Sequence, residues 1–168
     1  MNFFHYCWNL CYATSKKIGI ALFHLIFITL FCTLPHELGH AIARNCFSHK
    51  VKYIMLGFGG SSRFSFNLVY KFKLGKIPFI FGYTRYGSYI NNWKKDLISA
   101  SAGLIINLLL ALLAWWAESK IENKFCKKFF RLVKEYNALT IIYNFLFSPL
   151  WNPNCDVRRI FSLLFRRG

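Results

Sequence analysis

Long apolar stretches constrain this chain more than any other feature of its sequence. One runs from Ile18 to Leu34 and continues beyond Pro35, and another runs from Leu97 to Ala117. A helix that crosses a bilayer needs about 20 apolar residues. Both stretches therefore predict membrane-spanning helices. A third apolar run, from Ala138 to Trp151, has only 14 residues, which predicts a short or re-entrant segment.

The composition agrees with a membrane protein. Charged residues make up 17% of the 168 residues, too few to coat a soluble domain, while the 55% apolar content excludes disorder. The 22 Lys and Arg against 6 Asp and Glu give a formal net charge of +16. The basic residues flank apolar runs, which favours anionic lipid over nucleic acid as their partner. The six cysteines contain no C-x-x-C pair, so neither a zinc ribbon nor a disulfide framework is indicated.

Other segments have other periods. Apolar and polar residues alternate within residues 51–90, which predicts strands, and residues 120–136 combine an apolar stripe with basic side chains, which predicts a helix on the membrane surface. Residues 1–17 are rich in interfacial aromatics. We therefore expect a mainly α membrane protein, a single membrane-embedded core with a small β-hairpin or sheet after the first of three core transmembrane helices. The first two helices are expected at residues 18–44 and 96–117. Residues 138–166 are expected to contain the third helix, which is broken, and a basic tail.

The basic residues also predict an orientation. Fourteen of them lie in the loop between the first two spans and in the C-terminal tail, whereas eight lie in the N-terminal flank and the 120–134 loop. Loops rich in Lys and Arg stay in the cytoplasm. We therefore expect a multi-pass integral membrane protein whose strand-rich loop and C-terminus are cytoplasmic.

Residues 36–40 form an H-E-x-x-H motif, His36-Glu37-Leu38-Gly39-His40. Residues i and i+4 share one face of a helix, so both imidazoles can reach one Zn²⁺. Glu37 then lies beside the metal, where it can take a proton from water. An accidental motif is the alternative, but two His and one Glu at membrane depth are expensive without a function. Pro35 is expected to kink the helix just before the motif.

A catalytic zinc ion needs a third protein ligand and one open position. The sequence contains no Asp or Glu from residue 38 to residue 95. Asp156 is favoured, because it follows the helix break at Asn152-Pro153-Asn154 inside a short apolar segment. Its alternative role is an N-terminal charge on the last short helix. The other candidate ligands are Asp96, Glu118, Glu122, Glu135, His49 and Cys46, of which the three glutamates are expected to be solvated and Asp96 to be a helix N-terminal charge.

In this order, the motifs resemble those of the site-2 protease family of intramembrane zinc metalloproteases. The first span carries H-E-L-G-H, and residues 101–107, from Ser101-Ala102-Gly103 to Asn107, are similar to the family's A-G-P-x-x-N. Pro153 keeps the family spacing of three residues before Asp156. The chain departs from the family pattern at Leu104, which replaces Pro, at Val157, which replaces Gly, and at Cys155, just before the Asp.

The resemblance implies a zinc metalloendopeptidase that hydrolyses peptide bonds in or near transmembrane segments, as in regulated intramembrane proteolysis. His36, His40 and Asp156 would bind one Zn²⁺ per chain, and Glu37 would be catalytic. The implied partners are the lipid bilayer and a membrane-spanning protein or peptide substrate, which pairs with a strand edge. No nucleic acid partner is expected, and the resemblance does not specify an oligomeric state. Candidates for orienting the substrate are Asn107, Asn144 and Asn152.

Two other functions fit the same sequence. The first is a catalytically silent, metal-binding homologue that acts as a membrane interaction protein. The second is a small structural or channel-like membrane protein without a metal ion. Zinc content separates the second alternative from the protease, and replacement of Glu37 separates the first.

Overall fold

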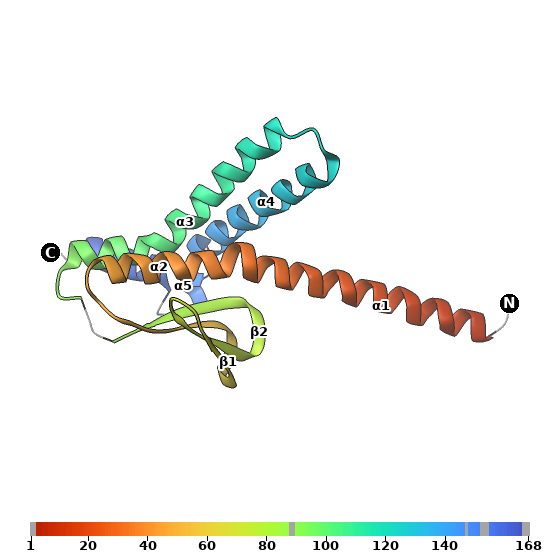
Figure 1. Cartoon of the computed structure of the whole chain (residues 1–168), viewed down its shortest axis with the longest axis horizontal. Helices are drawn as coiled ribbons and strands as arrows, with labels where there is room; N and C mark the ends of the chain where they lie inside the picture. The colour runs from red at the N-terminus through yellow and green to blue at the C-terminus, as the bar shows by residue number, and fades with distance from the viewer. Residues whose placement is uncertain (1–2, 88–89, 147, 152–154, 166–168) are drawn as a thin grey trace.

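The computed structural model combines six α-helices, one π-helical turn and a small sheet in the described part of the chain, which comprises residues 3–87, 90–146, 148–151 and 155–165 (Figure 1). The long first helix, the sheet and an inclined pair of helices follow one another along the chain. In chain order the elements are α1 (Phe3–Ile28), η1 (Thr29–Thr33), α2 (Leu34–Cys46), β1 (Val51–Asn67), β2 (Lys71–Tyr86), α3 (Trp93–Lys120), α4 (Lys124–Leu146), α5 (Ser148–Trp151) and α6 (Asp156–Phe165).

Two helical stretches of the described residues are long and apolar enough to cross a membrane. The first is Thr14–Cys46, which runs through η1 into α2 as one rod, and the second is α3 (Figure 1). Large apolar side chains such as Leu113 and Trp116 on α3 are exposed, as expected for a surface that faces lipid. Two of the three predicted core spans are therefore supported, whereas the predicted count of three is not.

The C-terminal third of the chain is divided differently from the prediction. A single helix, α4, includes most of the segment predicted as a surface helix and the start of the predicted third core helix. No Gly or Pro lies between Lys124 and Leu146, so nothing in the sequence interrupts this helix. It lies beside α3 and buries Val133 and Asn137, so the basic segment is part of the helix bundle rather than a separate surface helix (Figure 1).

Where a kink was predicted before the motif, the helix contains a π-helical turn, η1. Proline has no N–H group, so it leaves the carbonyl of Phe31, four residues earlier, without its helical partner. The side-chain amide of Asn137 on α4 donates to this carbonyl at 3.1 Å, and Asn137 is fully buried. The N–H of Leu34 donates to the carbonyl of Thr29, which is the five-residue step of a π-helix. Helix α4 therefore satisfies the irregular backbone directly before the H-E-x-x-H motif.

The predicted sheet after the first span is confirmed. Strands β1 and β2 form an antiparallel pair, in which residues 54–56 of β1 lie opposite residues 84–82 of β2; the register also pairs residues 54–56 with residues 72–74, which run in the same direction. Ile54 of the sheet packs in a buried cluster with Ala41 of α2. The sheet thus covers one side of α2, which leaves the histidine face of the same helix for α3.

Candidate metal centre

Two glycines bring the histidine face of α2 close to α3. A Cβ atom on Gly39 would lie 2.9 Å from the carbonyl oxygen of Ala102, which is closer than Cβ atoms come to such groups. On the facing helix, a Cβ on Gly103 would lie 2.5 Å from Nε2 of His40 and 2.7 Å from Nε2 of His36. The space that holds both imidazoles therefore depends on Gly103 having no side chain.

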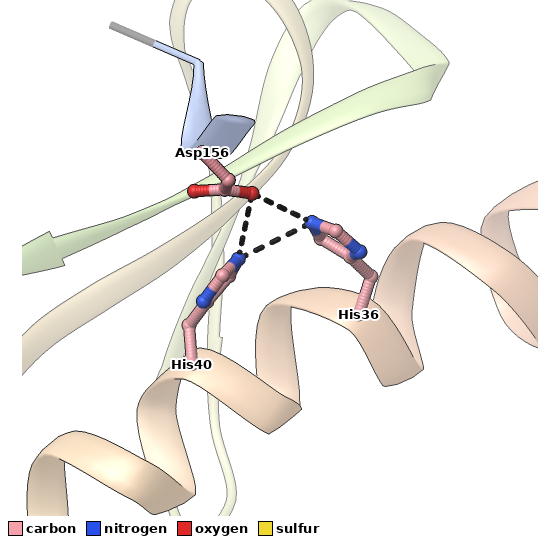
Figure 2. Close-up of side chains that lie close together, drawn as sticks. All are labelled: His36, His40 and Asp156. Carbon is pink, nitrogen blue, oxygen red and sulfur yellow. Dashed lines mark hydrogen bonds and ion pairs between the residues drawn. The ribbon is translucent and has the colours of Figure 1, made fainter. Parts of the chain in front are cut away.

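Three ligand atoms converge in this space (Figure 2). Nε2 of His36 lies 3.1 Å from Oδ2 of Asp156, Nε2 of His40 lies 3.0 Å from the same oxygen, and the two nitrogens are 3.2 Å apart. Tetrahedral zinc with bonds of about 2.0–2.1 Å would separate its ligand atoms by roughly 3.3–3.4 Å. The triangle therefore has nearly the dimensions of one face of a zinc coordination tetrahedron.

The hydrogen bond that holds the ring of His40 agrees with metal binding. Nδ1 of His40 donates to the backbone carbonyl of Ser99 on α3 at 2.7 Å, and a carbonyl oxygen can only accept. In the neutral ring, Nε2 then carries a lone pair that points at the carboxylate of Asp156. His36 and His40 are 7% and 3% exposed, so both rings are largely shielded from bulk water. Lone pairs gathered in a buried space repel one another unless a cation lies between them, and this donor set fits Zn²⁺.

Glu37 lies beside this triangle and is held by the sheet. Its side chain is 5% exposed, and the hydroxyl of Thr84 on β2 donates to Oε2 at 2.8 Å, with the backbone carbonyl of Glu37 3.1 Å away. A Cβ on Gly82 would lie 2.8 Å from Cγ of Glu37, so the strand passes directly over the carboxylate. No motif in the sequence indicated a role for Thr84. The alternation of β2 puts residues 82, 84 and 86 on one face, but it does not say which helix that face meets.

Among the residues that the structure describes, only His36, His40 and Asp156 form a group of three side chains able to share a metal ion. Asp96 instead accepts hydrogen bonds from two arginines. Glu118 was expected to be solvated but is buried, because Arg131 and Lys134 on α4 bind its carboxylate at 2.8 and 2.6 Å. The other candidate ligands lie outside the group; they are Glu122, Glu135, Cys46 and His49.

The three candidate substrate-orienting asparagines have different surroundings. Asn107 is fully buried on α3, one turn from Gly103, and its amide nitrogen and oxygen have no hydrogen-bond partner in the described part of the chain. Asn144 donates to the carbonyl of Thr140 on its own helix at 2.9 Å. Asn152 lies outside the described residues. Asn107 thus lies one turn along α3 from Gly103, the residue that faces both histidines.

The positions at which the chain departs from the site-2 protease pattern are neighbours in space. Leu104, Cys155 and Val157 form one buried cluster, and Ile160 packs against it. Cys155 and Val157 flank Asp156, so this cluster attaches the start of α6 to α3. The departures thus form a packed contact of this chain, and they leave the three convergent side chains in place.

The two apolar helices and the His–His–Asp cluster between them define a candidate membrane metalloprotein. A family model described as Peptidase family M50 matches residues 23–163, which is most of the chain. The chain therefore belongs to Peptidase family M50, the site-2 protease family. Members are integral membrane zinc metalloproteases, so membership implies membrane-protein substrates and a lipid environment. The comparison with curated proteins gives no match.

Proposed function

We propose that this protein is an active intramembrane zinc metalloendopeptidase that hydrolyses peptide bonds in or near the transmembrane segments of membrane-bound substrates. The proposal is carried by the convergence of His36, His40 and Asp156 within 3.2 Å of one another, beside the buried carboxylate of Glu37. Zinc held by these three residues would supply a Lewis acid that polarises the scissile carbonyl and lowers the pKa of water towards neutrality.

Glu37 is the residue that we assign to proton transfer. It accepts a proton from the attacking water while the water oxygen forms a bond to the carbonyl carbon of the substrate. When the C–N bond breaks, Glu37 returns this proton to the amine nitrogen of the leaving segment. Because Thr84 donates to Oε2, the other carboxylate oxygen, Oε1, is left to exchange the proton.

Asn107 is the residue that we assign to orienting the substrate. A buried amide without a partner costs about 1–3 kcal/mol, and a hydrogen bond to the substrate backbone would remove this cost. The substrate segment would be extended and would pair with the sheet that covers Glu37, as in other cases of strand addition. The contact between Thr84 and Glu37 supports this arrangement, because it puts β2 directly beside the reacting groups.

We also propose that the strand-rich loop and the C-terminal tail face the cytoplasm. This orientation rests on the fourteen basic residues on that side against eight on the other. Cysteine labelling from either side of the membrane tests it, since Cys46 is exposed at the end of the first span. Labelling of Cys46 only from the side opposite the cytoplasm would reverse the orientation.

Zinc content and processing test the proposed function together. The full-length protein purified from membranes is expected to contain one zinc ion per chain, and Asp156→Ala is expected to lose it together with cleavage of co-expressed single-span substrates. Glu135→Ala, which removes an exposed carboxylate on α4, is the matched control and should keep both. A parent protein without zinc would instead identify a metal-free membrane protein.

Thr84→Val is expected to lower kcat about 10- to 100-fold with unchanged zinc content, because a hydrogen bond to a charged group is worth about 1.5–3 kcal/mol. Valine has nearly the shape of threonine but lacks the hydroxyl that donates to Glu37. Thr84→Ser keeps the hydroxyl and should stay close to the parent in kcat. Steady-state cleavage by the three proteins decides the point, and a parent-like kcat for Thr84→Val would show that this hydroxyl does not orient Glu37.

A further inference from the structure

A second polar cluster lies one helical turn from the candidate metal centre. Arg44 follows His40 by four residues on α2, and Arg159 follows Asp156 by three residues on α6. Asp96 lies in the first turn of α3, three residues before Ser99, whose backbone carbonyl accepts a hydrogen bond from the ring of His40. Each member therefore lies one turn from a residue that is a candidate ligand or that holds one.

The carboxylate of Asp96 joins the three helices. Nη2 of Arg44 donates to its Oδ1 at 2.8 Å, while Arg159 donates to Oδ1 through Nη2 at 2.7 Å and to Oδ2 through Nε at 3.2 Å. Arg44 is 1% exposed, and the ring of Tyr86 lies over its guanidinium at 4.0 Å. Burial raises the pKa of Tyr86 although Arg44 opposes the shift, so the phenol is neutral and adds no charge.

The pair of Arg159 with Asp96 has a geometric consequence for α6. The apolar cluster around Leu104 holds this short helix against α3, but apolar contacts are not directional. A bidentate arginine–carboxylate pair is directional, because two parallel hydrogen bonds fix both the position and the rotation of the guanidinium. Asp156 and Arg159 share one face of α6, so a rotation that breaks the pair also moves the Asp156 carboxylate away from the two imidazoles.

We infer that Arg44, Asp96 and Arg159 form a positioning cluster that sets the Asp156 carboxylate against His36 and His40 and thereby determines the affinity of the site for zinc. This inference deepens the proposed function and rests on its metal centre. The sign of the effect distinguishes positioning from charge. Loss of a positive charge near a cation site favours cation binding by Coulomb's law, whereas loss of positioning weakens it.

Arg159→Gln in the full-length purified protein tests the inference, with the dissociation constant for zinc measured by competition against a chelator. Replacing residues that orient metal ligands weakens metal binding by about 10- to 100-fold, and we expect a loss in this range. Arg158→Gln is the matched control, because it removes the same charge from the preceding residue of α6, which is exposed. Its zinc affinity should equal that of the parent or be slightly higher.

Arg159→Lys separates the charge from the fork of hydrogen bonds, since lysine keeps the charge but cannot form a bidentate pair. We expect its zinc affinity to lie between those of the parent and Arg159→Gln, and this milder variant decides the question if Arg159→Gln loses helical content in circular dichroism. Saturating zinc should restore part of the cleavage rate of both variants.

Two results would overturn the inference: parent-like zinc affinity in both Arg159 variants, or an equal loss in Arg158→Gln. Neither result would contradict the proposed function. The proposed function fails if the parent protein binds no zinc, or if it binds zinc without cleaving any substrate. Because the dissociation constant is measured without a substrate, the inference is tested even if cleavage is absent.

Discussion

Glu37→Gln is expected to lower the rate of peptide-bond cleavage by about 10²–10⁴-fold, the usual contribution of a general acid–base group, while zinc content stays at that of the parent. Glutamine has the size of glutamate and can still accept a hydrogen bond from Thr84 through its amide oxygen. It cannot accept a proton from water at neutral pH. The metal ligands are on His36, His40 and Asp156, so the site should remain assembled.

The measurement is processing of co-expressed single-span substrates, compared between the parent and Glu37→Gln, with metal analysis of both purified proteins. Glu135→Gln, the same change at an exposed position on α4, is the control for non-specific effects. Equal processing by the parent and Glu37→Gln would exclude the protease assignment. A parent that holds zinc but processes nothing would indicate the catalytically silent homologue.

Gly103→Ala is expected to weaken zinc binding by more than about 100-fold, because its methyl group would occupy the space of both imidazoles. The added Cβ would lie 2.5 Å from Nε2 of His40 and 2.7 Å from Nε2 of His36, so both rings would have to move. Any such movement takes the ligand nitrogens out of the triangle with Asp156. Alanine favours a helix over glycine by about 0.8–1.0 kcal/mol, so α3 itself should not be destabilised.

Gly19→Ala is the matched control for this prediction. Gly19 is also in the interior of a long helix, α1, but a Cβ there would meet nothing within 4 Å. Zinc titration of the three proteins and circular dichroism of their helical content provide the comparison. Parent-like zinc affinity in Gly103→Ala would contradict the close contact between α3 and the two histidines.

Local patterns predicted those features that depend on neighbouring residues. The length of the apolar runs predicted the two spans, and the helical period put His36 and His40 on one face of α2. Alternation predicted the sheet. Periodicity did not separate a surface helix from a bundle helix, because an apolar stripe with basic flanks is typical of both; α4 was therefore divided wrongly at residue 136.

Contacts between segments that are distant in the sequence were harder to predict from local patterns. Asp156 was favoured as a ligand because it follows a helix break inside a short apolar segment, but nothing local showed that α6 would reach α2. Asp96 was interpreted as a helix N-terminal charge, and its two arginine partners are 52 and 63 residues away along the chain. The contact of Thr84 with Glu37 likewise joins a strand to a helix that ended before the sheet began.

The membrane-spanning lengths, the strand alternation and the spacing of the two histidines were thus decided within short stretches of sequence, because steric repeat and hydrophobicity act over a few neighbouring residues. Tertiary packing alone decided three other features: the contact of Asp156 with those histidines, the hydrogen bond from Thr84 to Glu37, and the linking of three helices by Asp96. Packing sums many weak, non-directional contacts over the whole chain, so the sequence of any one segment does not contain its result.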